Sequence, residues 1–243
     1  MPARLSPRAD ANKSIARSVS RNLKKAKSGA ARRALRPDLD LSQREFDTLK
    51  RLSTPHKIQE YLNGIKANFE PHGDTVLSVR EVLKQRRAHC IEGALLAACA
   101  LWIQGEPPLL LDLKAVRDYD HVVALFRRGG CWGAISKTNH PQLRHRDAVY
   151  RSLRELAMSY FHEYTNKKGR QTLRQYSRAF DLRKVDPKLW VTNGDDCWKV
   201  ADILDEIRHY PLITAKQARL LHRRDAIERK AGKLLQYPTP RRK

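Results

Sequence analysis

Apolar residues recur every three or four positions in two neighbouring segments of the N-terminal half, which predicts two amphipathic helices. The first segment carries Leu41, Phe46, Leu49 and Leu52, and the second carries Ile58, Tyr61, Leu62 and Ile65. Thr54-Pro55 separates them, and threonine is a good helix cap while proline fits a first helical turn. We therefore expect the packed chain to begin near Leu41 with two short helices.

A continuous run of small and apolar residues follows Cys90 and stops before Gly105. Glycine and alanine on every side of a helix let other elements approach closely, so this run predicts a buried central helix. Ser78, with Glu81 three residues later, has the spacing of a capping box and predicts a short helix to about Arg87 just before it.

Three strands are predicted after the central helix, over residues 109–113, 121–126 and 131–135. Gly129-Gly130 separates the last two and favours a tight hairpin turn. One buried helix followed by an antiparallel sheet indicates an α+β fold, with further helices on its flanks.

Two longer helices are predicted in the C-terminal half. Asp147 can cap a helix that runs to about Tyr164. Thr214 begins the spacing of a second capping box, which predicts a basic helix with its apolar residues turned inward. Those apolar residues are Leu220, Ile227, Ala231 and Leu234.

The charge of the chain is strongly positive, at +23 over 243 residues. Residues 1–36 contain eleven Lys and Arg but a single acid, and they have few large apolar residues. We divide the chain into a disordered basic tail (1–37), a folded domain (38–212) and a basic C-terminal helix and tail (213–243). Such a surface attracts polyanions, including nucleic acid, anionic membranes and acidic proteins.

The four cysteines form no CxxC pair, which indicates a reducing, cytoplasmic setting. The longest apolar run, over 94–103, is too short to span a bilayer. The basic N-terminus resembles either a mitochondrial transit peptide or a bacterial basic tail. No close chelating pair of ligands is evident, so we expect neither a metal nor another cofactor.

Cys90 is the strongest candidate for chemistry. At a helix N-terminus, and after the cationic pair Arg86-Arg87, a cysteine is favoured as its thiolate. His121, at the start of a predicted strand, could take the thiol proton. Glu92 could complement the helix N-terminus, or it could lie beside a pocket and bind an amine.

Several segments resemble the transglutaminase-like superfamily, and more closely an uncharacterised bacterial group within it. These are His89-Cys90-Ile91-Glu92-Gly93-Ala94, Asp120-His121-Val122, Trp132-Gly133-Ala134-Ile135-Ser136-Lys137 and the RSLRELAMSYFHEY segment from Arg151. The resemblance implies a papain-like core in which Cys90 on a buried helix attacks an acyl carbon and His121 is its partner. It also implies acyl transfer or hydrolysis on a protein, peptide or other amide substrate.

This chain departs from that pattern at the third catalytic position. An acid usually follows the tryptophan, whereas Ser136 stands there; Asp118, Asp120 or Asn139 could replace it. Ile91 also stands where an aromatic residue is common. We expect the substrate-binding residues to come from the surroundings of Cys90 and the last strand, namely Arg87, Glu92, Trp132, Lys137 and Asn139.

Two other functions compete with an enzyme. The first is a catalytically inactive version of the same fold that binds acidic partners through its basic ends. The second is a nucleic-acid-binding protein whose cysteine is incidental, although its basic C-terminal helix lacks interleaved aromatic residues.

Overall fold

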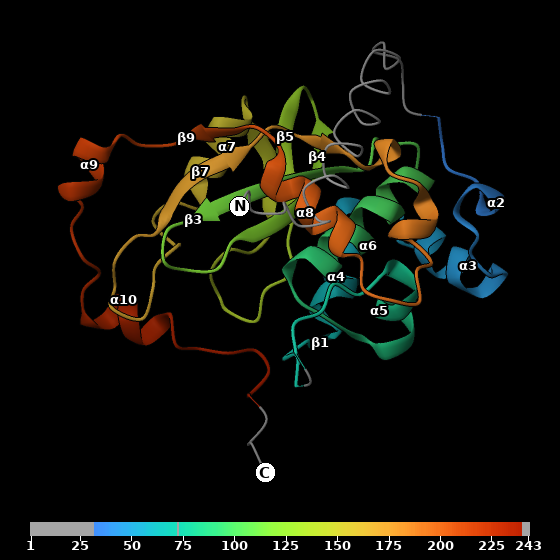
Figure 1. The fold of residues 1–243 in the computed structure, drawn as a ribbon, viewed down its shortest axis with the longest axis horizontal. Helices are drawn as coiled ribbons and strands as arrows, with labels where there is room; N and C mark the ends of the chain where they lie inside the picture. Colours follow the sequence, from blue (N-terminus) through green and yellow to red (C-terminus); the bar gives the residue numbers. More distant parts are fainter. Residues whose placement is uncertain (1–31, 72, 240–243) are drawn as a thin grey trace, which may run out of the picture. The chain divides into compact units, whose positions relative to one another are not determined.

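The computed structural model describes residues 32–71 and 73–239, and a seven-stranded sheet lies at the centre of this part (Figure 1). The strand order is β6-β5-β4-β3-β7-β9, β8 also pairs with β3, and every pairing is antiparallel. The strands are β3 (Leu109–Ala115), β4 (His121–Arg128), β5 (Cys131–Ile135), β6 (Arg146–Tyr150), β7 (Leu173–Ser177), β8 (Phe180–Asp181) and β9 (His209–Pro211).

Helices come before, between and after these strands. They are α2 (Arg36–Leu39), α3 (Gln43–Arg51), α4 (Pro55–Asn63), α5 (Val79–Gln85), α6 (Cys90–Ile103), α7 (Leu153–Ser159), α8 (Trp198–Glu206), α9 (Ala215–Arg219) and α10 (Ala226–Ala231). Two short strands, β1 (Lys66–Ala67) and β2 (Arg87–Ala88), pair in parallel beside α5 and place the start of α6. The mixture of helices with an antiparallel sheet confirms the predicted α+β class.

Alternate residues of β4 enter two separate cores, because successive side chains of a strand point to opposite faces. Val122, Ala124 and Phe126 join the core that contains α6. Val123 and Leu125 join the core that contains residues of α7. The sheet is thus covered on both faces.

Helix α6 is the centre of the larger core. All its residues except Cys90 and Trp102 are buried, as the small-residue run predicted. Gly93 allows the closest approach: a Cβ there would lie 2.4 Å from Cβ of Lys137. Lys137 is itself buried, and its Nζ donates to the carbonyls of Leu62 and Ile65 at the end of α4.

The other early predictions are also confirmed. Helices α3 and α4 form, and Thr54 caps α4. Gly129 and Gly130 both have positive φ, at 55° and 80°, as a tight hairpin turn requires. The packed chain begins earlier than Leu41, since Ala34 is buried and α2 starts at Arg36.

The predicted helix from Asp147 to Tyr164 is wrong at both ends, since α7 covers only Leu153–Ser159. Arg146–Tyr150 is strand β6, which pairs with β5. Helix α7 begins only at Leu153, where Ser152 accepts a hydrogen bond from the Glu155 N–H. Hydrogen bonding to the sheet edge decides the structure of residues that also fit a helical spacing.

The predicted C-terminal helix is also wrong. Thr214 does cap a helix, but α9 ends at Arg219 and α10 is separate from it. Leu220, Ile227 and Leu234 are exposed rather than turned inward. Strands β7 to β9 and α8 fall in a region whose sequence gave no clear periodicity.

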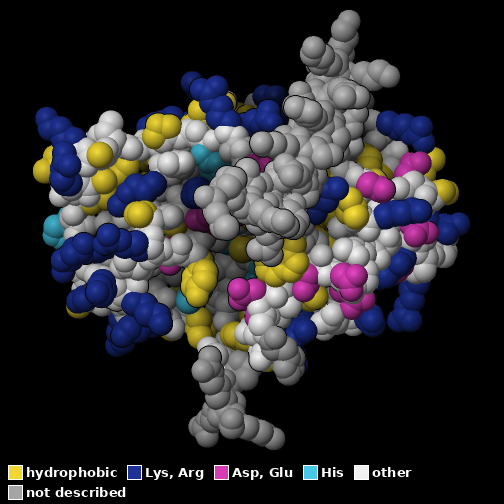
Figure 2. Space-filling model, in the orientation of Figure 1, with side chains coloured by type: hydrophobic (Ala, Val, Ile, Leu, Met, Phe, Trp, Pro, Cys, Tyr) yellow, Lys and Arg dark blue, Asp and Glu magenta, His cyan; other side chains and the backbone are white. Residues whose placement is uncertain are grey.

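Charge is unevenly distributed over the face shown in Figure 2. Lys and Arg side chains crowd the side on which α9 and α10 lie, and acidic side chains gather on the side that holds α5 and α8. The predicted disordered tail falls mostly on residues 1–31, outside the described residues. In the described ranges no helix is both long and apolar enough to cross a membrane.

The packing at Gly93 is testable. Alanine is normally better than glycine in a helix by about 1 kcal/mol. We nevertheless expect Gly93→Ala to lower the free energy of unfolding by about 1–3 kcal/mol, because the added methyl overpacks against Lys137. Urea denaturation measures the change. Gly194→Ala is the control, since a Cβ there meets nothing within 4 Å; an equal loss in both variants would contradict the account.

Candidate active site

Cys90 is the first residue of α6 and is partly exposed. The first N–H groups of a helix have no acceptor within the helix and give its N-terminus a partial positive charge. Any anion at the Cys90 sulfur is therefore stabilised by the helix that carries it. His89 immediately precedes Cys90 as the N-cap residue.

His121 lies at the start of β4, and its Nε2 is 2.8 Å from Oγ of Ser136 at the end of β5. The Ser136 hydroxyl also donates to the Leu143 carbonyl, so its oxygen accepts the Nε2–H of His121. Gln59 fixes the Ser136 backbone with two hydrogen bonds, to its carbonyl and from its N–H. This network assigns the His121 tautomer, in which Nδ1 is the unprotonated nitrogen.

His89 places a second imidazole beside the same sulfur. Its Nδ1 is 3.9 Å from the Cys90 Sγ. Its Nε2 faces acceptors alone: the Thr75 carbonyl at 2.8 Å, Glu92 Oε1 at 3.2 Å and Glu70 Oε1 at 3.4 Å. Burial by itself would lower the pKa of His89, but the interactions with Cys90 and Glu92 outweigh it and raise that pKa to about 11. His89 is therefore an imidazolium at neutral pH.

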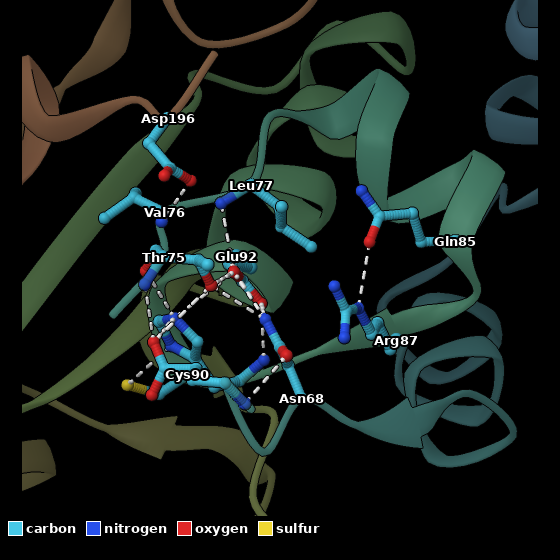
Figure 3. A network of polar contacts seen from close by, with 11 residues as sticks. Asn68, Thr75, Val76, Leu77, Gln85, Arg87, Cys90, Glu92 and Asp196 are labelled. Atoms are coloured by element: carbon cyan, nitrogen blue, oxygen red, sulfur yellow. Dashed lines mark hydrogen bonds and ion pairs between the residues drawn. The ribbon is translucent and has the colours of Figure 1, made fainter. Parts of the chain in front are cut away.

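Glu92 is the anion that holds this cation, at the centre of the network in Figure 3. Its side chain is fully buried and accepts hydrogen bonds from Asn68 Nδ2, Thr75 Oγ1 and the N–H groups of Leu77 and His89. Burial would raise the pKa of this carboxyl, but the His89 ring and the backbone donors lower it. Every contact of Glu92 is thus internal, and an amine substrate does not reach it.

The Cys90 thiol responds to both histidines. Burial would raise its pKa, but interactions with His121 and then His89 lower it well below its usual range. By contrast, burial raises the pKa of the Cys99 and Cys197 thiols. Cys90 is the cysteine whose surroundings favour a reactive thiolate.

The alternative partners considered for His121 are occupied elsewhere. Asp120 accepts from the Ala115 N–H, and Asp118 accepts from Thr172. Asn139 exchanges hydrogen bonds with the backbone of Tyr237. Ser136 is the residue that the structure brings to His121.

The expected substrate-binding residues lie in different places. Lys137 is buried, and its Nζ is bound to the carbonyls of Leu62 and Ile65, so it is not exposed to a substrate as the prediction required. Arg87 donates to Gln85, away from Cys90 in Figure 3. Trp132 is half-buried on β5 under the Arg127 guanidinium. Roles in binding for Arg87, Trp132 and Asn139 stay predictions.

His89 is the site residue that the sequence prediction left out. A signal was present, since His89 and Glu92 have the three-residue spacing of a capping box, in which the side chain of Glu92 returns to the His89 N–H.

No family model matches this chain, and no curated protein matches its sequence. The chemistry of the site is therefore inferred from its own geometry.

Replacing the buried carboxylate tests this network. We expect Glu92→Gln to lower the free energy of unfolding by about 3–5 kcal/mol at neutral pH. His89 loses the negative charge of Glu92, and the four hydrogen-bond donors around that carboxylate face a neutral amide instead. The pKa of Glu92 is lowered in the folded state, so its contribution is present above the ordinary carboxyl range and is lost as pH falls through the folded pKa.

The difference between wild type and Glu92→Gln should therefore shrink in acid, as followed by urea denaturation across pH. Glu60→Gln is the matched control because Glu60 is exposed on α4. A difference that is small, or that does not change with pH, would contradict the role of the Glu92 charge.

Proposed function

We propose that this protein is a thiol-dependent enzyme of acyl transfer or amide hydrolysis, with a transglutaminase-like core. The observation that carries the proposal is one thiol at a helix N-terminus, beside the His89 imidazole, whose pKa is lowered by both His121 and His89. A buried structural cysteine needs neither histidine and gains nothing from a lowered pKa.

The two histidines are suited to different tasks. His89 is bound to acceptors at Nε2, and with a pKa of about 11 it keeps its proton at neutral pH. It is a fixed cation that stabilises the thiolate. His121 has Nδ1 available to move a proton, since Ser136 binds only Nε2.

The reaction then follows from thiol chemistry. Nδ1 of His121 takes the Cys90 thiol proton, and the thiolate attacks the acyl carbon. The Cys90 N–H, which has no acceptor within α6, can donate to the developing oxyanion. Collapse expels the leaving group, which takes the proton from Nδ1 of His121, and leaves a thioester on Cys90. Water or an amine then attacks the thioester and gives a proton to Nδ1 of His121. The carbon–sulfur bond breaks, the acid or the new amide leaves, and the Cys90 sulfur takes the proton back from His121.

The role of Ser136 is consistent with these different tasks of His89 and His121. At the position where the superfamily pattern has an acid, Ser136 orients the imidazole of His121 but adds no charge. The carboxylate of this site is Glu92, which acts on His89 instead. Stabilisation of the thiolate is thus shared between the proton-shuttling His121 and a second histidine, His89.

The arrangement of elements supports the resemblance to transglutaminase-like enzymes. The cysteine opens a buried helix, and a histidine opens the first strand of an antiparallel hairpin that packs on it. The competing proposal, an inactive fold that binds acidic partners, draws on the uncharged Ser136 and on the basic side of Figure 2. The two proposals differ in whether Cys90 can be acylated.

Acylation by p-nitrophenyl acetate separates them. We expect a burst of p-nitrophenolate close to one per chain, with the acetyl group located on Cys90 by mass spectrometry. His121→Ala should slow the burst at neutral pH by about tenfold or more, because His121 takes the thiol proton and lowers the pKa of Cys90. Cys90→Ala should abolish it, and His222→Gln, an exposed histidine, should not change it. The proposal of an enzyme is refuted if Cys90 is acetylated no faster than other residues.

A further inference from the structure

Three side chains with metal-ligand chemistry meet at the sheet edge, apart from the cysteine site. His56 is the second residue of α4, His145 directly precedes β6, and Asp147 lies within β6. One ligand atom from each lies within 4.8 Å of the others. Nearly ninety residues of chain separate His56 from the other two, so only the fold brings them together.

The distances fit a small tetrahedral metal. Asp147 Oδ1 is 3.3 Å from Nε2 of His56 and 3.3 Å from Nε2 of His145. Zinc binds such atoms at about 2.0–2.2 Å, and the edges of a tetrahedron of that size are about 3.3–3.5 Å. Both imidazole nitrogens are thus already at the spacing from the Asp147 oxygen that a single Zn²⁺ requires.

His145 is held in place before any metal binds. Its ring stacks on Phe126 of β4, with centroids 5.7 Å apart and planes 17° apart. Its Nδ1 is buried without a hydrogen-bond partner, while Nε2 faces Asp147. A ring fixed by packing, with its functional nitrogen directed at the other ligands, is a preorganised metal ligand.

The other two ligands are open to solvent. The side chains of His56 and Asp147 are 73% and 70% exposed, so an ion can reach them. An exposed ion pair of this kind contributes little stability by itself. Asp112, Asp120 and Asp205 form a second group of possible metal ligands. Two of them already have partners, since Asp112 pairs with His209 and Asp205 pairs with Lys114.

We propose that His56, His145 and Asp147 bind one Zn²⁺ ion, with the fourth coordination position open to water or another ligand. Two imidazoles and one carboxylate, with an open position, are a ligand set that zinc uses in proteins. The site goes beyond the proposed cysteine chemistry and shares no residue with it.

An ion bound here would also affect the loop beside the cysteine site. His145 is two residues beyond Leu143, whose carbonyl accepts from Ser136, the partner of His121. A metal that joins α4 to this segment would brace the loop that orients the His121 ring.

Zinc titration of the untagged full-length Cys90→Ser chain tests the proposal, since removing the thiol excludes zinc binding at Cys90. Calorimetry should show one Zn²⁺ per chain, and Co²⁺ should give the intense visible absorption of a tetrahedral site. His56→Gln and Asp147→Asn should each weaken binding by about tenfold or more, since loss of a mere outer-shell partner costs about 10–100-fold.

Both changes are at exposed side chains, so folding should be preserved, and thermal denaturation without metal checks this. His222→Gln should bind zinc like the parent chain, and zinc should raise the melting temperature of the parent but not of His56→Gln. The proposal is overturned if zinc does not saturate at one site, or if His56→Gln and Asp147→Asn bind as the parent does.

Discussion

The site depends on one buried carboxylate. Glu92 has no exposed surface, yet it is charged, and burying a lone charge costs many kcal/mol unless it is paired and hydrogen-bonded. Here the charge is stabilised by the His89 ring and by hydrogen bonds from Asn68, Thr75 and two backbone N–H groups. Because these partners come from segments on both sides of α5, Glu92 also fixes how the chain reaches the start of α6.

The same carboxylate sets the electrostatics of the thiol. Together with Cys90 it raises the pKa of His89, and His89 joins His121 in lowering the pKa of the Cys90 thiol. The ring of His121 is held by the neutral Ser136 hydroxyl, and the buried carboxylate of the site acts on His89 instead.

Local patterns predicted the elements that carry the site. The small-residue run fixed α6 and placed Cys90 at its start, and the glycine pair fixed the β4–β5 hairpin. Contacts between distant residues were beyond such patterns. Lys137 is buried because carbonyls of α4 accept from it, Arg146–Tyr150 is extended because β5 pairs with it, and His56 meets His145 only through the fold.

The central claim is that the His89 cation, held by Glu92, acts with His121 to stabilise the Cys90 thiolate. Its most direct test is the rate of Cys90 alkylation by iodoacetamide against pH, in wild type, His89→Gln and the control His222→Gln. The account predicts an apparent thiol pKa well below about 8.5 in wild type and in the control, and one higher by about one pH unit or more in His89→Gln. An unchanged profile in folded His89→Gln, or an ordinary thiol pKa in wild type, would contradict it.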